Sequence, residues 1–337
     1  MSPRLWAAVL LATVAGMRAM AGEAPRLALP LDCRPGVDCF IQNYVDTDPG
    51  PEAQDFTCGS LTYDQHDGID FRVASLAEMR AGVEVRAAAA GRVLNIRDEM
   101  ADSGWKDQDP AGSEPRLCGN GVLIAHGEGW TTQYCHMKRG SIAVARGQEV
   151  EAGQRLGEIG YSGKTTFPHL HLTVRKGTAV HDPFTGRRQD QGCGEREGDA
   201  TLWTEAAAVA LGYRASGLLA AGFAERAPER EEIEAGGFGA DRLSKTAPAL
   251  VFWIEVYGLR QGDVEVLRLI DAAGAVLAET TTEPAPRHRA VQFRFLGRRK
   301  RGTAWPLGAY RGEYRLMRAV RGEPTEVLKV ERTLQVR

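Results

Sequence analysis

The eight residues "FPHLHLTV", 167–174, decide the fold that the rest of the sequence supports. Their alternation predicts a strand after a proline, because residues two apart on a strand face the same side. His169 and His171 then share one face, while Leu170 and Leu172 point into apolar packing. One buried histidine is commonly a core residue, but two on one face need two sets of partners. A zinc ion satisfies both, since neutral imidazole is a strong zinc ligand; the alternative is a pair of structural histidines.

A second group of polar residues occurs in "QHDGIDF", 65–71. His66 and Asp70 are four residues apart, but Gly68 and the strand-like "GIDFRV" that follows argue against a helix. The pair therefore differs from the helical zinc motif H-E-x-x-H. A turn through Asp67 and Gly68 can still bring both side chains to one point. Taken alone, however, the two are better explained as a loop histidine and a turn aspartate.

The third piece, "TTQYCHM", 131–137, is the second arm of a hairpin. The hairpin is predicted from alternating arms around the turn 126–129 in "GNGVLIAHGEGWTTQYCHM". If this arm is a regular strand, Tyr134 and His136 share a face. A lone inward histidine on a strand is usually structural, and His126 on the first arm has the same interpretation.

The histidines are concentrated in one part of the chain. Six of the seven fall between residues 66 and 181, and only His288 lies in the C-terminal part. A catalytic zinc takes three protein ligands and keeps a fourth position open. Further imidazoles can act as general base and stabilise developing charge. A carboxylate and several imidazoles in a Gly-rich β-domain therefore predict a catalytic zinc site.

The ordered set H-x3-D, then Y-x-H at the end of a hairpin, then P-H-L-H resembles the lysostaphin-like zinc endopeptidases, metallopeptidase family 23. These enzymes cut the peptide bridges of peptidoglycan. The resemblance covers about residues 60–185 and includes the glycine pattern "GQEVEAGQRLGEIGYSGKTT", 147–166, before P-H-L-H. It implies a Gly-rich antiparallel β catalytic domain of the swapped-hairpin type.

The resemblance also assigns roles to five residues of this sequence. It implies that His66, Asp70 and His171 bind one Zn²⁺ per chain. The hairpin histidine, His136, and the first histidine of H-x-H, His169, are then the catalytic pair, and which of them is the general base stays open. The implied partner is peptidoglycan, and the implied reaction is hydrolysis of peptide bonds in its cross-links or stem peptides.

Three other functions are compatible with parts of the sequence. A catalytically silent, wall-associated amidase activator keeps the fold without the ligands, but here all five site positions are filled. A secreted protease for Gly-rich proteins uses the same chemistry on another substrate. A structural adhesin depends on the C-terminal part, where "RRKR", 298–301, could touch an anionic polymer but is better explained as a solvated loop tip.

Composition and the N-terminus bear on the compartment. The formal net charge of -2 gives no case for a nucleic-acid partner, which usually shows as a basic domain. The N-terminus "MSPRLWAAVLLATVAGMRAMAGEAP" has an arginine, an apolar run and then Ala-Met-Ala, which predicts a cleaved signal peptide over residues 1–21. An uncleaved membrane anchor is the alternative. The protein is therefore expected to be exported, to the periplasm or the extracellular space.

Six cysteines without a C-x-x-C pair favour disulfides over a zinc knuckle. Six allow 15 pairings, and the sequence does not choose among them. Cys33 with Cys39 would close a short loop, and Cys118 with Cys135 flank the predicted hairpin. Both pairs are expected on these grounds only.

The 337 residues are expected to form about two domains, mainly β. The expected divisions are a signal peptide (1–21), a Cys-containing N-terminal segment (22–60), a zinc endopeptidase domain (61–195), a linker (196–214) and a β-sandwich domain (215–337). Regularly spaced strands such as "ALVFWIEVYGL" and "AVQFRFLG" predict that the last is an immunoglobulin-like sandwich. It carries none of the ligand set, so the chemistry is expected to reside in 61–195. The substrate groove is expected beside the loop 97–117 and the loop before His169.

Overall fold

The structure is a computed structural model that describes residues 23–105 and 117–337. The expected signal peptide and residues 106–116 of the expected groove loop lie outside the described residues. Antiparallel strands dominate, which confirms the expected mainly β class. Among the described residues, no helix is long and apolar enough to cross a membrane.

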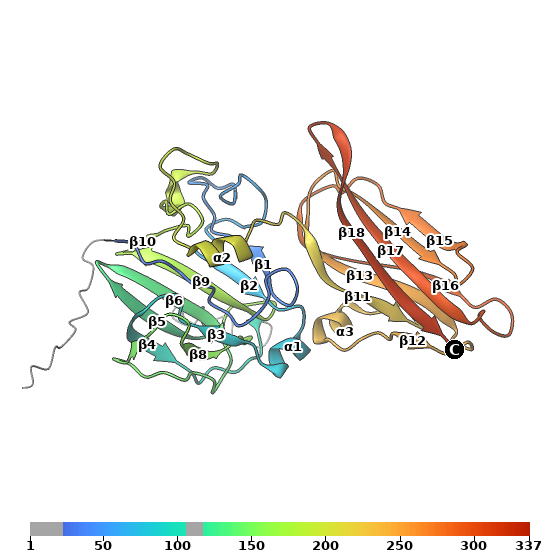
Figure 1. Ribbon diagram of the computed structural model, residues 1–337, viewed down its shortest axis with the longest axis horizontal. Coiled ribbons are helices and arrows are strands. Elements are labelled where there is room, and N and C mark those ends of the chain that lie inside the picture. The colour runs from blue at the N-terminus through green and yellow to red at the C-terminus, as the bar shows by residue number, and fades with distance from the viewer. Residues whose placement is uncertain (1–22, 106–116) are drawn as a thin grey trace, which may run out of the picture.

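An eight-stranded antiparallel sheet forms the first half of the molecule (Figure 1). The expected hairpin is confirmed at its centre, and "FPHLHLTV" supplies the neighbouring strand. In spatial order, the strands are β1 (Phe40–Asn43), β2 (Ile69–Arg72), β9 (His169–Lys176), β6 (Trp130–Met137), β5 (Asn120–Gly127), β4 (Gly91–Arg97) and β7 (Glu149–Val150), with β10 (Ala179–Val180) beside β9.

Small elements surround this sheet. They are β3 (Glu84–Arg86), which pairs with β8 (Arg155–Glu158), helix α1 (Leu76–Ala81), the 3-10 helix η3 (Gln189–Gln191) and helix α2 (Glu205–Ala210). One face of the sheet is apolar, with Leu170 and Leu172 of β9 buried in the core beside Tyr134 of β6. The other face is therefore free to carry His169 and His171.

The C-terminal sandwich (residues 217–336) consists of two further sheets. One sheet contains β11 (Gly217–Ala224), β13 (Ala249–Leu259) and β16 (Arg289–Arg299), and the other contains β12 (Arg242–Leu243), β18 (Glu323–Val336), β17 (Gly308–Val320), β14 (Val264–Ile270) and β15 (Val276–Thr281). Side chains of both sheets share one apolar core, which makes them a sandwich. Helix α3 (Arg230–Ala235) lies between β11 and β12 in the chain. An immunoglobulin-like topology stays a prediction.

The C-terminal sandwich packs directly against the first half (Figure 1). Leu219 and Tyr257 belong to the apolar core of the eight-stranded sheet, and the Tyr257 ring lies 6.0 Å from that of Phe40. Gly236, at the end of α3, lies so close to α1 that a Cβ there would sit 2.5 Å from Ser75 Oγ. Its φ of +83° also favours glycine. The α1–α3 contact therefore requires a glycine at this position.

Three disulfides hold the loops around the sheet. The expected pairs Cys33–Cys39 and Cys118–Cys135 are confirmed. The third bond, Cys58–Cys193, was not chosen from the sequence. It joins residues 135 positions apart, and all five expected site residues lie between its ends.

Candidate metal centre and its comparison with known proteins

Three donor atoms from separate segments meet at one point. His66 comes from the loop before β2, Asp70 from β2 and His171 from β9. His66 Nε2 lies 3.2 Å from both Asp70 Oδ1 and His171 Nδ1, and the last two atoms are 2.9 Å apart. Ligand bonds of about 2.0–2.2 Å around tetrahedral zinc give donor–donor edges of about 3.3–3.6 Å. The triangle is therefore a few tenths of an ångström tighter than these edges, and a small outward shift of the three side chains would fit a zinc ion.

In each of the three residues, a neighbouring group bonds to one polar atom. The other polar atom faces the centre of the triangle and remains available to bind a metal. His66 Nδ1 donates to the Tyr44 carbonyl (2.7 Å), so Nε2 keeps its lone pair. His171 Nε2 lies 3.1 Å from Asp67 Oδ1, so its Nδ1 keeps a lone pair. Asn43 Nδ2 donates to the outer oxygen of Asp70 (2.7 Å). With His171 neutral, three acceptors face one another, an arrangement that a bound cation satisfies.

Strand pairing explains why the carboxylate and the imidazole meet. β2 and β9 are antiparallel, with Asp70 opposite His171 and Arg72 opposite His169. Residues directly opposite in such a pair share a face. Gly68 is also required, because a Cβ there would lie 2.5 Å from His171 Nε2. The turn in "QHDGIDF" therefore does deliver His66 and Asp70 to one point.

The two remaining site histidines lie beside the triangle. The rings of His136 and His169 are 4.6 Å apart, and His169 Nε2 lies 3.2 Å from Asp70 Oδ1. His136 Nδ1 donates to the Ser162 carbonyl (2.8 Å), and His169 Nδ1 donates to the Phe167 carbonyl (2.9 Å). Because carbonyl oxygens only accept, these bonds place the hydrogen of each neutral ring on Nδ1 and leave Nε2 without one.

The expectation that Tyr134 and His136 share a face is wrong. Tyr134 pairs with Leu172 and is buried in the apolar core, whereas His136 contacts the histidine cluster. The register of β6 shifts at this point, and His136 has a φ of +61°. A β-bulge of this kind re-aims a side chain, and it turns the imidazole to the metal face.

The sequence of this region matches the model of "Peptidase family M23" over residues 64–183. Residues 64–183 are an M23 peptidase domain. All five site residues lie within the match. Peptidoglycan DD-endopeptidase ShyA of Vibrio cholerae is 47% identical over 109 residues, which are 32% of this chain and 20% of that protein.

Two further proteins are similar to part of the chain. Cell division protein DipM of Caulobacter vibrioides is 33% identical over 113 residues, covering 33% of this chain and 17% of that protein. A solved structure of a zinc-containing peptidase from Vibrio cholerae is 23% identical, covering 41% of this chain and 39% of that one, with a TM-score of 0.27. The chain spans about a fifth of the length of the curated relatives named here.

Burial and neighbouring charges set the protonation of the M23 site. Burial opposes ionisation of Asp70, but His66 and His169 hold its pKa well below the usual range. Burial also disfavours charge on His171, yet its hydrogen bonds to Asp67 and Asp70 raise its pKa to about 9. Burial and the neighbouring imidazoles hold the pKa of His136 well below its usual range, so this ring is neutral at pH 7.

Sequence reasoning missed the residues that hold the ligands of the M23 site. Asp67 lies inside "QHDGIDF" and could have been singled out. Asn43 gave no signal, because its contact with Asp70 depends on the pairing of β1 with β2. His126 lies apart from the cluster and bonds to the Ala90 carbonyl and the Thr132 hydroxyl, as expected of a structural histidine.

The described ends of the groove loop lie beside the loop that precedes His169. The Gly104 and Trp105 amides donate to the carbonyls of Tyr161 and Thr165, over 2.9 and 2.8 Å. The hydroxyl of Thr165 lies 3.1 Å from His169 Nδ1. The described ends of the 97–117 loop are therefore next to the imidazole of His169.

Proposed function

We propose that the protein is an exported zinc endopeptidase that hydrolyses peptide bonds in the cross-links or stem peptides of peptidoglycan. The donor triangle of His66, Asp70 and His171, with two further imidazoles beside it, carries the proposal. The identity of 47% with a peptidoglycan DD-endopeptidase over 109 residues supports the substrate class. The chemistry is assigned to residues 61–195, and residues 215–337 are proposed as a second domain.

His66, Asp70 and His171 would hold one Zn²⁺. When bound, zinc polarises a carbonyl and lowers the pKa of water towards about 7. Asn43 and Asp67 orient the ligands, which raises their affinity for the ion.

The two other imidazoles would move protons and stabilise charge. His136 is neutral, and its free Nε2 can accept a proton from the attacking water. His169 has its Nε2 3.2 Å from Oδ1 of Asp70, at the edge of the donor triangle. It is therefore proposed as the group that stabilises the negative charge on the substrate oxygen, in the form that carries a hydrogen on Nε2.

Export is supported by the three disulfides, because such bonds persist in oxidising compartments. The silent-activator alternative is not favoured, since no ligand position is lost. Proteolysis of Gly-rich proteins remains the rival substrate class, and an adhesin role has no support in the M23 match.

Two measurements on the purified protein test the proposal. Metal analysis gives its zinc content, and digestion of isolated sacculi and of a Gly-rich protein shows which substrate it cuts. We expect about one zinc per chain and release of peptide fragments from the sacculi, identified by mass spectrometry. The chelator-treated protein is the control. Intact sacculi in the presence of fully loaded protein would overturn the substrate assignment, and protein that cannot take up zinc would overturn the metal assignment.

A further inference from the structure

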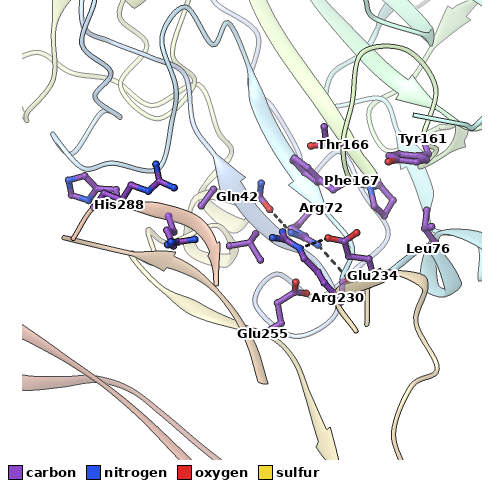
Figure 2. A pocket seen from close by; sticks show the side chains of 16 residues that line it. Gln42, Arg72, Leu76, Tyr161, Thr166, Phe167, Arg230, Glu234, Glu255 and His288 are labelled. Carbon is purple, nitrogen blue, oxygen red and sulfur yellow. Dashed lines mark hydrogen bonds and ion pairs between the residues drawn. The ribbon is translucent and has the colours of Figure 1, made fainter. Parts of the chain in front are cut away.

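A cavity of about 400 Å³ lies where the C-terminal sandwich meets the M23 domain. Figure 2 shows side chains from both parts of the chain around it. Arg72 and Phe167 come from the M23 domain, whereas Arg230 and Glu255 come from the C-terminal sandwich. Neither part forms this cavity alone.

The cavity is next to the catalytic site. The Phe167 ring in its wall stacks on His169, with 4.3 Å between ring centres and 25° between planes. The Arg72 guanidinium lies 5.1 Å from the centre of the same Phe167 ring. Arg72 follows the metal ligand Asp70 by two residues on the same face of β2, a distance of about 7 Å. An extended peptide with its scissile bond at the metal would thus place a side chain about two residues away in the cavity.

Arg72 is a buried cation without a direct ion pair in the described part of the chain. It is 4% exposed, and its guanidinium donates to the Gln42 side chain and to the Val73 and Ala74 carbonyls. The carboxylates of Glu255, Glu234 and Glu78 act on its charge only across space, without a direct contact. Burying an unpaired charge is costly. A ligand carboxylate at this position would neutralise it.

Glu255, on β13, is the complementary group. It is 1% exposed, and its Oε2 has no hydrogen-bond partner in the described part of the chain. Burial raises the pKa of Glu255, and the charges of Arg72 and Arg230 oppose that rise. Arg230 itself is paired with Glu234 at 2.7 Å. A buried carboxylate oxygen is therefore left for a donor from outside the chain.

We propose that this cavity binds the zwitterionic end of a diamino acid in the substrate peptide, with its carboxylate on Arg72 and its ammonium on Glu255. The assignment rests on the proposed function, because it places the substrate peptide on the M23 site. Apolar atoms of Leu76, Pro168 and Val291 also line the cavity and suit the methylene chain of such a residue. The C-terminal sandwich thereby takes part in substrate recognition.

Two soluble peptides that differ in one group test the proposal. They are Ala–γ-Glu–meso-diaminopimelate, whose side chain ends in an ammonium and a carboxylate on one carbon, and the same peptide with lysine, which lacks that carboxylate. Calorimetry with the zinc-loaded full chain should show about 10- to 100-fold weaker binding of the lysine peptide, since a charged hydrogen bond is lost. Equal binding of both peptides, or no binding of either, would overturn the proposal.

Variants locate the site. Glu255→Gln removes the anion at nearly constant size and should weaken binding of the diaminopimelate peptide by about 10- to 100-fold. Glu231→Gln on the exposed side of α3 is the matched control and should bind as the unmodified chain does.

Zinc content and thermal unfolding of each variant identify misfolded protein. If Glu255→Gln is misfolded, the test uses Arg72→Lys instead, which keeps the positive charge but loses the planar guanidinium. Full binding by a folded variant of Glu255 overturns the proposal. Peptide binding that persists while sacculi stay intact supports the cavity and contradicts only the proposed hydrolysis.

Discussion

Tyr134 and His136 are two residues apart on β6, yet their side chains lie on opposite faces of the sheet. The Tyr134 hydroxyl oxygen lies within the core, where it accepts a hydrogen bond from the Ala88 amide (2.7 Å). His136 lies beside His169 on the metal face. The bulge between them supplies the fifth site residue, because a regular strand would bury that imidazole in the core.

This placement separates ligands from catalytic histidines. His171→Ala should lose zinc and activity together. His136→Ala and His169→Ala should keep most of their zinc and lose activity by roughly 10²–10⁴-fold, because the donor triangle stays intact. The double variant should be little worse than either single one, since both side chains act on one reaction step. Zinc content and turnover are measured on the same preparations.

His126→Gln is the control for these variants, because His126 lies on the same hairpin but outside the cluster. It should retain both zinc and turnover. Loss of zinc by His169→Ala as complete as that of His171→Ala would show that His169 is a ligand.

Asn43→Ala should weaken zinc binding without removing a ligand. The change deletes the amide that donates to the outer oxygen of Asp70, and such supporting contacts are typically worth about 10- to 100-fold in metal affinity. Competition with a chelator measures the affinity. Activity should return at saturating zinc, whereas an Asp70→Ala variant should not recover. Unchanged affinity in Asn43→Ala would mean that the strand pairing alone orients Asp70.

The Cys58–Cys193 bond should contribute strongly to stability. Replacing both cysteines by serine should lower the free energy of unfolding by about 2–5 kcal/mol, because the bond closes a loop of 135 residues in the unfolded chain. The Cys33→Ser/Cys39→Ser variant, which opens a loop of only 6 residues, should lose less. Denaturant unfolding of both variants gives the comparison. Equal losses would contradict an effect of loop length.

Asp182 should make stability depend on pH. Burial raises its pKa to about 6, while bonds from Thr185 and Phe184 to one carboxylate oxygen oppose the rise. A folded pKa above the unfolded value of about 3.9 means that stability is highest below pH 4 and falls as pH rises through 6. Asp182→Asn keeps the accepting oxygen and does not titrate. Between pH 4 and 7 the unmodified chain should lose about 3 kcal/mol relative to this variant.

Unfolding free energies of the two proteins, measured in urea at several pH values, check this prediction. Other titrating groups act equally on both proteins and cancel in the difference. Parallel curves across this range would show that folding does not raise the pKa of Asp182.

Much of the M23 site could be predicted from the sequence because its residues stand in short motifs whose local structure the sequence indicates. Strand alternation alone placed His169 and His171 on one face, with Leu170 and Leu172 in the core. The order of three short motifs then singled out His66 and Asp70 as the other members of the donor triangle. Two of the three disulfides also followed from short separations along the chain.

What only the tertiary structure decided depends on pairing between distant segments. The face of His136 is set by a bulge, which breaks the period of two on which the sequence prediction rested. Asn43 reaches Asp70 only because β1 adds to the edge of β2. Arg72 and Glu255 belong to different sheets, and nothing in their local sequence places them on one cavity. Alternation fixes the side of a strand that a residue occupies, but packing between sheets determines what it meets there.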